Sequence, residues 1–477
     1  MAISIPLPQA FARRPFPFTA RTTVLLLVWL LPFHSLIMAW LFGGLKWPGS
    51  TVRMLASWKE ATVVVLFVWA VGRTVLGRTE RTRITAPDIA ITSLIALAGV
   101  YLLLQSNVFG IGMPVAAELY GFRDAVFFML LYYVGRATPE LAADDRILRH
   151  LFYVSLVVSV IGILERLFIS PDTLVLIGVA TYMNDFLGVS AFTEGNEWGL
   201  PQNYWTYFGG VPIRRAGSVF LHSQGFALPF LLLIPAATAW ALNRSVNRSA
   251  WLRVAYAVIW IGLALTITRM TIAICFVQLA LFYLIVRRPE WTAATVVAAG
   301  AAFIASMVVV PGVFTFVWET LTWQSPSSES HLREWIRGTV AFAEKPWGHG
   351  LGTTDQVAVR FGMEPVTGDN MYFAYAAQMG LLGFVAHVGA LVAILGFSWY
   401  LARKAATENQ RRVGIVMTLT TVGILLNGAT SLVFSSTFLV CLYFWLAGSV
   451  VTVAEKTRSM NALARRASVA PKGPGEG

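Results

Sequence analysis

The stretch FSSTFLVCLYFWLAGSVVTV, residues 434–453, holds twenty consecutive residues without a single charged side chain. A helix of about 20 apolar residues is long enough to cross the hydrocarbon core of a bilayer. Inside lipid the backbone must satisfy its own hydrogen bonds, and a helix does so within one segment. The alternating pattern of a membrane barrel is absent from this sequence. The stretch therefore predicts a transmembrane helix.

Similar apolar stretches recur along the whole chain. Of its 477 residues, 57% are hydrophobic and 13% are charged, whereas about a quarter of the residues in a soluble protein are charged. We therefore predict an all-α integral membrane protein with about 12 transmembrane helices. The predicted spans lie near residues 22–43, 61–77, 87–107, 119–135, 148–168, 217–242, 251–268, 271–286, 291–311, 371–401, 413–431 and 434–453.

Basic residues cluster at the ends of the apolar stretches, and they predict the orientation of the chain. By the positive-inside rule, short loops rich in lysine and arginine face the cytoplasm. The side assigned to the cytoplasm carries Arg13, Arg14, Arg78, Arg81, Arg83, Arg146, Arg149, Arg244, Arg248, Arg287, Arg288, Arg403, Lys404, Arg411, Arg412, Lys456, Arg465 and Arg466. This orientation puts both termini in the cytoplasm of a bacterial inner membrane. It also explains the net charge of +12 without nucleic acid as a partner.

The chain thereby divides into three predicted parts. Residues 1–21 form a cytoplasmic tail, residues 22–453 a polytopic transmembrane domain, and residues 454–477 a basic, disordered cytoplasmic tail. Two long loops, about 169–216 and 312–370, fall on the extracytoplasmic side. The second lies between spans 9 and 10, and its four tryptophans favour a folded, partly helical loop near the membrane interface. Loops of this length are usually functional or disordered.

Arginines on the extracytoplasmic side run against the positive-inside rule and are candidate site residues. Arg214 and Arg215 precede the sixth span, and Arg269 lies in the short turn between the seventh and the eighth. A guanidinium group binds phosphate through two oxygens at once and keeps its charge. The alternative interpretation is an arginine that extends to lipid head groups.

The second long loop holds a group of charged and titratable residues. His331, Arg333 and Arg337 fall within one or two helical turns, and the spacing of four places both arginines on one face. Histidine is a common general acid or base, so His331 is a candidate for that role. An amphipathic helix at the membrane interface is the alternative. The glycines at 348, 350 and 352 suit a tight loop in which the backbone approaches another group closely.

Asp369, at the start of the tenth span, is a second candidate base. Its alternative role is to cap that helix. His222 is of interest because it follows Arg214 and Arg215. The sequence contains no metal-ligand pattern in either long loop, and both cysteines lie inside apolar stretches. We therefore predict neither a metal nor another cofactor.

Three segments, in this order, resemble the O-antigen polymerase and O-antigen ligase family. Arg214-Arg-Ala-Gly-Ser-Val-Phe220 is similar to the start of a family span, although His222-Ser-Gln224 stands where Pro-Asn usually follows. Leu265-Thr-Ile-Thr-Arg-Met-Thr-Ile-Ala273 is similar to the Thr-x-Ser-Arg signature, with Thr268 in place of serine. Residues 330–335, 345–352, 368–373 and 378–383 resemble the long periplasmic loop and the helix after it. The resemblance covers about residues 211–390.

The resemblance implies a glycosyltransferase that uses an undecaprenyl-diphosphate-linked glycan donor at the periplasmic face, without a metal. By matching positions, Arg269 takes the diphosphate-binding role. Displacing a polyprenyl diphosphate builds up negative charge, which fixed cationic donors stabilise. The further candidates for binding diphosphate are Arg215, Arg214 and Arg337; the candidate catalytic residues are His331, Asp369 and Arg333; the supporting residues are Asn370, Thr268 and His222.

Three functions stay open at this point. Asp369 stands where ligases typically carry the histidine of a His-Asn pair, and Asn370 retains the asparagine. This departure favours a polymerase of O-antigen, capsule or exopolysaccharide over a ligase that transfers glycan to lipid A core. A transporter or flippase for a lipid-linked sugar is the third interpretation. The expected partners are the donor, a glycan or lipid acceptor and membrane lipid, and a chain-length regulator and a flippase are candidates.

Overall fold

The computed structural model describes residues 18–77, 83–106, 112–188, 196–208, 211–241, 249–309, 312–324 and 326–469. Within these residues the fold is helical apart from one antiparallel hairpin, formed by β1 (Trp205–Phe208) and β2 (Val211–Arg214). The predicted tails at residues 1–17 and 470–477 lie outside the described residues. The all-helical fold is confirmed.

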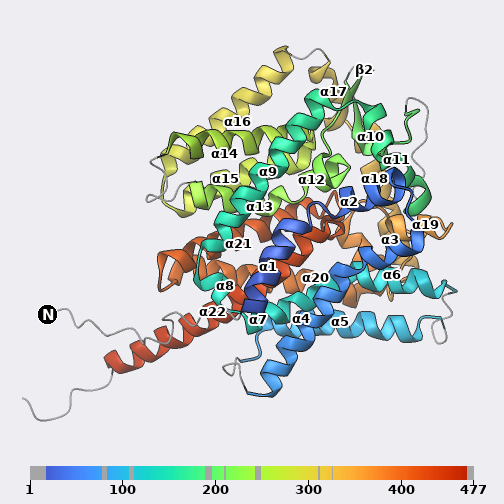
Figure 1. The fold of residues 1–477 in the computed structure, drawn as a ribbon. Coiled ribbons are helices and arrows are strands. Elements are labelled where there is room, and N and C mark those ends of the chain that lie inside the picture. The colour runs from blue at the N-terminus through green and yellow to red at the C-terminus, as the bar shows by residue number, and fades with distance from the viewer. Residues whose placement is uncertain are drawn as a thin grey trace, which may run out of the picture.

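The helices fall into those before and those after the hairpin (Figure 1). Those before the hairpin are α1 (Phe18–Leu30), α2 (His34–Ala39), α3 (Gly49–Ala56), α4 (Trp58–Val75), α5 (Ala86–Leu104), α6 (Val115–Ala125), α7 (Leu131–Ala137), α8 (Glu140–Ala143), α9 (Arg146–Phe168), α10 (Pro171–Ile177) and α11 (Val179–Thr181). Those after it are α12 (Ser223–Ala227), α13 (Phe230–Ala241), α14 (Ala250–Leu265), α15 (Arg269–Ile285), α16 (Pro289–Val309), α17 (Val313–Leu321), α18 (Pro326–Glu344), α19 (Asp355–Arg360), α20 (Met371–Lys404), α21 (Glu408–Asn427) and α22 (Thr437–Val469). Short 3-10 and π segments are η2 (Trp40–Gly44), η3 (Phe127–Leu130), η4 (Tyr182–Phe186), η5 (Gln202–Tyr204), η6 (Ser218–Phe220) and η7 (Val433–Ser435).

Several helices have the length and composition of membrane spans. Six in the described part of the chain qualify outright: Gly49–Val75, Ala86–Leu104, Arg146–Phe168, Ser223–Ala241, Met371–Lys404 and Thr437–Ala464. Shorter apolar helices add Phe127–Ala137, Ala250–Leu265, Arg269–Ile285 and Pro289–Ala305. The protein is therefore a multi-pass membrane protein, whereas the number of twelve spans stays a prediction.

Two helices differ from their predicted limits. The span expected at 22–43 is divided into α1, α2 and η2, because Pro32 cannot donate the hydrogen bond that would continue α1. The last helix does not stop near residue 453 but continues to Val469, through part of the tail that was expected to be disordered. Residues 454–469 include four alanines and three arginines, which favour a helix, and contain neither glycine nor proline.

The centre of the bundle is formed by α13 and α22, whose apolar residues are almost all buried. A helix that is hydrophobic on every side is typical of a protein core or of a membrane span. Trp445, Tyr443 and Phe444 of α22 pack here with Tyr132 of α7. Helix α7 approaches α22 so closely that a Cβ on Gly448 would lie 1.9 Å from the carbonyl oxygen of Tyr132.

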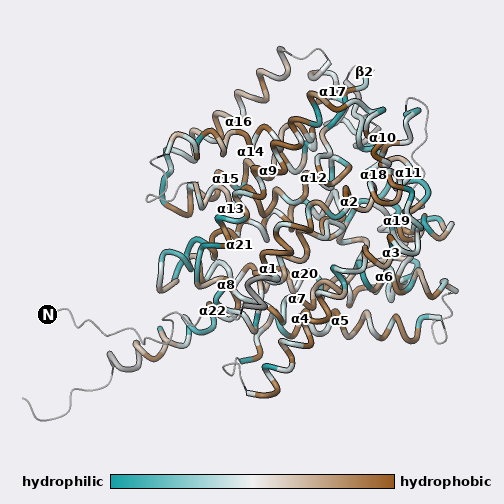
Figure 2. Tube along the Cα trace, viewed as in Figure 1, coloured by the Kyte–Doolittle hydropathy of each residue, from teal (hydrophilic) through white to brown (hydrophobic). Residues whose placement is uncertain are grey.

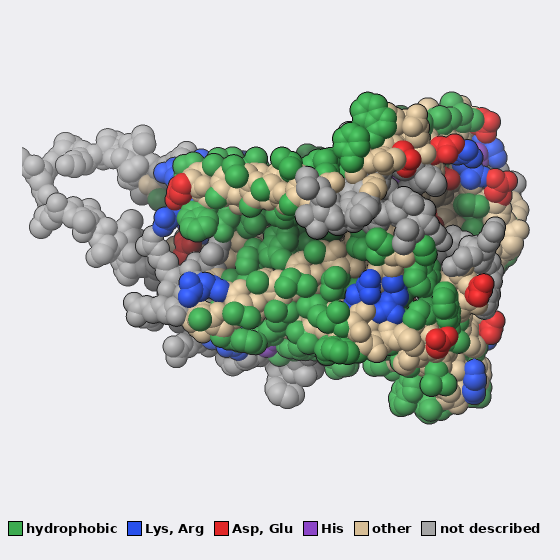
Figure 3. Space-filling view, turned by 90° about the horizontal axis from the view of Figure 1, so that it is seen from above, with side chains coloured by type: hydrophobic (Ala, Val, Ile, Leu, Met, Phe, Trp, Pro, Cys, Tyr) green, Lys and Arg blue, Asp and Glu red, His purple; other side chains and the backbone are tan. Residues whose placement is uncertain are grey.

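Polar groups gather mainly at the two ends of the bundle. Figure 1 shows α10, α11, α18 and α19 at one end, opposite the end at which α22 leaves the bundle. Hydrophobic residues dominate the helices between these ends (Figure 2), and green apolar side chains cover most of the middle of the molecule (Figure 3). Both predicted long loops therefore lie at the same end. We refer to it as the loop end.

Candidate functional site

Arg215 lies at the loop end, directly after β2, and bonds to the turn that joins α14 to α15. Its Nε donates to the carbonyl oxygen of Thr266 at 2.8 Å, and its Nη2 donates to Oγ1 of Thr268 at 2.7 Å. Burial, together with the positive charge of Arg269, lowers the pKa of Arg215 to about 10. The two guanidinium groups are thus electrostatic neighbours, although 54 residues separate them in the chain.

Arg269 is the first residue of α15, at the positive end of the helix dipole. Its Nη1 donates to Oγ1 of Thr320 on α17 at 2.8 Å. The turn before it contains Ile267 with φ of 49°, a strained conformation for a β-branched residue. Through the bond of Arg215 to Thr268, the residue before Arg269, both arginines lie at the N-terminus of a 17-residue helix, where a bound anion is favoured.

Arg214 has a different environment from its neighbour. Its guanidinium donates to the carbonyl oxygens of Glu165 and Arg166 at 2.8 and 2.9 Å, and to that of Ile169. These are the last carbonyls of α9, where a cation is favourable. Arg214 thus caps the C-terminal end of α9 and does not join Arg215 and Arg269.

His222 caps the short helix α12. Its Nδ1 accepts a hydrogen bond from the backbone N–H of Gly225 at 3.0 Å. Asn203 lies 3.4 Å from the same nitrogen. This contact gives His222 a structural role beside Arg215, without placing it on the anion site.

Titratable groups cluster where α18 meets the segment before α20. Burial raises the pKa of Asp369; Glu334 raises it further, whereas His331 opposes the shift. Burial likewise raises the pKa of Asp355 to about 7, with a further contribution from Asp369. His331 and Asp369, which the sequence predicts as candidate bases, are therefore brought together. A carboxyl group with a raised pKa can exchange a proton close to neutral pH.

The two arginines predicted on α18 form ion pairs with acidic neighbours. Arg333 pairs with Glu329 on the exposed face of the helix. Arg337 pairs with Glu334 at 3.6 Å and with Glu364. These carboxylates neutralise much of the charge that a diphosphate ligand would need.

The glycine-rich loop that follows α18 docks into a bend of α20. There Gly380 has φ of 65°, and a Cβ on it would lie 2.4 Å from the carbonyl oxygen of Pro346. The carbonyl oxygen of Gln378 accepts from the backbone N–H of Gly350 at 3.1 Å. The predicted close approach of backbone to another group is confirmed.

The turn after α21, residues 427–431, connects these elements, and the sequence analysis did not single it out. Nδ2 of Asn427 donates to Oγ1 of Thr271, half a turn beyond Arg269 on α15, at 2.9 Å. The carbonyl oxygen of Ala429 accepts from Nε1 of Trp335 and from Nδ2 of Asn370, both at 2.9 Å. This turn therefore joins the arginine side of the site to the His331–Asp369 side.

Two further bonds complete this connection. The backbone N–H of Met371 donates to the carbonyl oxygen of Gly428 at 2.9 Å, at the start of α20. Nε2 of Gln224 on α12 donates to Oγ of Ser431 at 3.2 Å. Four segments that lie between residues 214 and 371 thus meet at one turn. The only local signal was a cluster of polar residues at the end of an apolar helix.

These features define a multi-pass helical membrane protein that carries two arginines at a helix N-terminus and a neighbouring group of carboxyl groups at one end. In the described residues, no cluster of three or more histidine, cysteine or acidic side chains is arranged to hold a metal. Residues 254–388 match the family model Wzy_C, described as O-antigen ligase. The chain thus carries the O-antigen ligase domain of a polytopic membrane polymerase and ligase family, which confirms the resemblance. No curated protein matches the chain.

The matched segment covers most of α14, all of α15 to α19 and part of α20. It includes Arg269, His331 and Asp369, whereas Arg215 precedes it and the 427–431 turn follows it. Enzymes of this family transfer lipid-linked glycans.

Proposed function

We propose that this protein is a polysaccharide polymerase. It transfers glycan from an undecaprenyl-diphosphate donor to an acceptor glycan at the periplasmic face of the bacterial inner membrane. The observation that carries the proposal is the hydrogen bond of Arg215 to Thr268, which places Arg215 next to Arg269 at the N-terminus of α15. In this orientation the loop end is periplasmic, and both termini are cytoplasmic.

The reaction forms one glycosidic bond and breaks another bond at the same carbon. An acceptor hydroxyl attacks the anomeric carbon of the donor sugar, and the bond from that carbon to the diphosphate oxygen breaks. Negative charge then develops on the leaving polyprenyl diphosphate, and the guanidinium groups of Arg215 and Arg269 stabilise it. The proton of the acceptor hydroxyl passes to a base, for which Asp369 and His331 are the candidates.

Arg214, Arg333 and Arg337 are assigned other roles in this proposal. Arg214 orders the end of α9, Arg333 pairs with Glu329 within α18, and the ion pair of Arg337 with Glu364 holds α18 against the segment before α20. Thr268 positions Arg215 through its hydroxyl, and Asn370 caps α20 by accepting from the backbone N–H of Tyr372 and Phe373. These contacts keep both halves of the site in place.

A ligase is the second candidate, because the matching family model is described as O-antigen ligase. Purified protein is incubated with a lipid-diphosphate-linked repeat unit, with and without a lipid A core acceptor. We expect a ladder of longer products without the added acceptor. Product that forms only with lipid A core would instead identify a ligase, and absence of transfer in both reactions would contradict the proposed chemistry.

The transfer rate should depend on the protonation of Asp369. If Asp369 is the base, only its ionised form accepts the proton, so transfer rises with pH as the carboxyl ionises. Because burial raises this pKa above the usual 3.8, the rise lies at higher pH than for an exposed aspartate. We expect Asp369→Asn to remove this rise and to lower the rate about 100-fold or more.

The measurement is a pH–rate profile of wild type, Asp369→Asn and His331→Gln. A rise that disappears in His331→Gln but persists in Asp369→Asn would transfer the role of base to His331.

The stability of the fold should change with pH in the opposite direction to the transfer rate. Between about pH 4 and pH 7 the folded protein keeps a proton on Asp355 that the unfolded chain releases, so rising pH lowers stability through this group.

Asn427 should position the site without touching substrate. Asn427→Ala breaks the bond to Thr271 and loosens α15 against the turn, and small displacements of binding groups reduce catalysis strongly. We expect kcat to fall about 10-fold with little change in the donor KM. Thr420→Val is the control, because Thr420 bonds within α21 to the carbonyl oxygen of Val416. Equal losses in both variants would mean that Asn427 contributes only to stability.

A further inference from the structure

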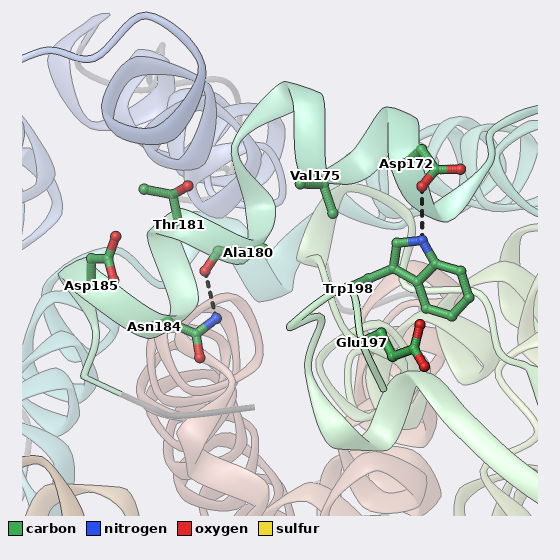
Figure 4. A pocket seen from close by; sticks show the side chains of 8 residues that line it. All are labelled: Asp172, Val175, Ala180, Thr181, Asn184, Asp185, Glu197 and Trp198. Carbon is green, nitrogen blue, oxygen red and sulfur yellow. Dashed lines mark hydrogen bonds between the residues drawn. The ribbon is translucent and has the colours of Figure 1, made fainter. Parts of the chain in front are cut away.

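A pocket of about 430 Å³ lies at the loop end, in the first long loop (Figure 4). Its walls come from α10, α11, η4 and the segment that leads to β1. The polar side chains that line it are Asp172, Thr181, Asn184, Asp185, Glu197 and Trp198. Binding sites for small ligands typically measure about 300–1,000 Å³. The pocket therefore has room for a short saccharide.

The walls of the pocket are held together by hydrogen bonds. Nδ2 of Asn184 donates to the carbonyl oxygens of Ala180 and Gly199, at 2.8 and 2.9 Å, and so joins two walls. Nε1 of Trp198 donates to Oδ1 of Asp172 at 2.8 Å, on one side of the pocket in Figure 4. A separate apolar cluster packs beneath these walls, with Val179, Tyr182, Met183, Phe186 and Leu200 among its buried members. The pocket is thus formed before any ligand arrives.

The lining favours an uncharged ligand rich in hydroxyl groups. The half-buried indole of Trp198 supplies an apolar surface, fixed by stacking on Trp205 with ring centres 5.6 Å apart. The carboxylates of Asp172, Asp185 and Glu197 accept hydrogen bonds from hydroxyl groups, and bonds to charged acceptors are the stronger kind. None of the described lining residues is a lysine or an arginine, so a phosphate group would be repelled.

The pocket is connected to the anion site through the hairpin. Trp205, on which Trp198 stacks, is the first residue of β1 and pairs in register with Arg214. The preceding residue, Tyr204, accepts through its carbonyl oxygen from the backbone N–H of Arg215 at 2.8 Å. The hairpin therefore links the pocket to Arg215, where the diphosphate that carries the glycan is proposed to bind.

We propose that this pocket binds sugar residues of the glycan, at a subsite separate from the diphosphate site. The inference rests on the proposed function, since it assigns glycan recognition to the first long loop of the same enzyme. The bound sugar belongs either to the donor or to the acceptor chain. Both present the same hydroxyl-rich chemistry to Trp198 and the carboxylates.

The experiment uses the native glycan of the bacterium that makes this protein. Lipid-linked oligosaccharide is extracted from a deletion strain, and mild acid removes the lipid diphosphate. Binding of this free glycan to the purified full-length protein is measured by saturation-transfer NMR. The variants are Trp198→Ala and Asp185→Asn. The side chain of Asp185 is exposed, and asparagine replaces it without loss of volume. The control is Trp399→Ala, a partly exposed tryptophan near the far end of α20.

We expect at least a fivefold loss of the glycan signal in Trp198→Ala and Asp185→Asn, but none in Trp399→Ala. Arg269→Ala should keep the signal while it loses transfer, which separates this proposal from the proposed function. A raised KM for donor or for acceptor in Asp185→Asn then identifies the source of the sugar. Free glycan that does not bind wild type, or that binds both pocket variants as well as wild type, would overturn the proposal.

Discussion

Arg269→Ala is expected to lower glycan transfer by about 100-fold or more, since removing one donor that stabilises developing charge typically costs this much. The side chain lies at the positive end of α15 beside Arg215. Losing it removes the guanidinium while leaving the helix N-terminus in place. Arg269→Lys should recover only part of the rate, because an ammonium group lacks the planar fork that binds two phosphate oxygens. The measurement is the rate of polymer formation by purified protein on a lipid-diphosphate-linked repeat unit.

Arg333→Ala is the matched control for this prediction. Arg333 also lies at the loop end, but its side chain is 75% exposed and pairs with Glu329 one turn away. Exposed pairs of this kind contribute little to stability, and we expect the rate to change less than threefold. If Arg269→Ala made full-length polymer at the wild-type rate, the role of Arg269 at the diphosphate, and with it the proposed function, would be contradicted.

Gly448→Leu is expected to prevent the bundle from assembling. A Cβ at this position would lie 1.9 Å from the carbonyl oxygen of Tyr132 and 2.8 Å from the backbone nitrogen of Arg136. Both atoms belong to the backbone of α7, which cannot move aside as a side chain would. Small residues at helix contacts allow such close approach in membranes, and overpacking typically costs 1–3 kcal/mol, occasionally more. We expect the monodisperse peak of the detergent-purified protein to disappear.

Gly396→Leu provides the comparison for Gly448. Gly396 lies in α20, and a Cβ there meets nothing within 4 Å. This variant should purify like wild type, because the new side chain faces open space that lipid would fill. If both leucine variants purified equally well, the close contact between α7 and α22 would be wrong.

The sequence by itself determined the fold class and the candidate residues of its motifs. Long apolar stretches such as residues 434–453 leave the backbone no alternative to a helix in lipid, so that prediction needs no tertiary information. Arg269 was found because it opposes the charge bias of the loops, and the 348–352 loop because its glycines permit close approach. Both signals are local in the chain.

Only the tertiary structure decided which candidates come together. Arg214 and Arg215 are adjacent in sequence but bind different partners, because successive side chains of an extended strand point to opposite sides. Arg337 pairs with Glu364, 27 residues away, which composition and helical spacing do not reveal. The turn at residues 427–431 joins both halves of the site through bonds to distant helices. Contacts between residues so far apart depend on how the helices pack, and packing is a property of the whole chain.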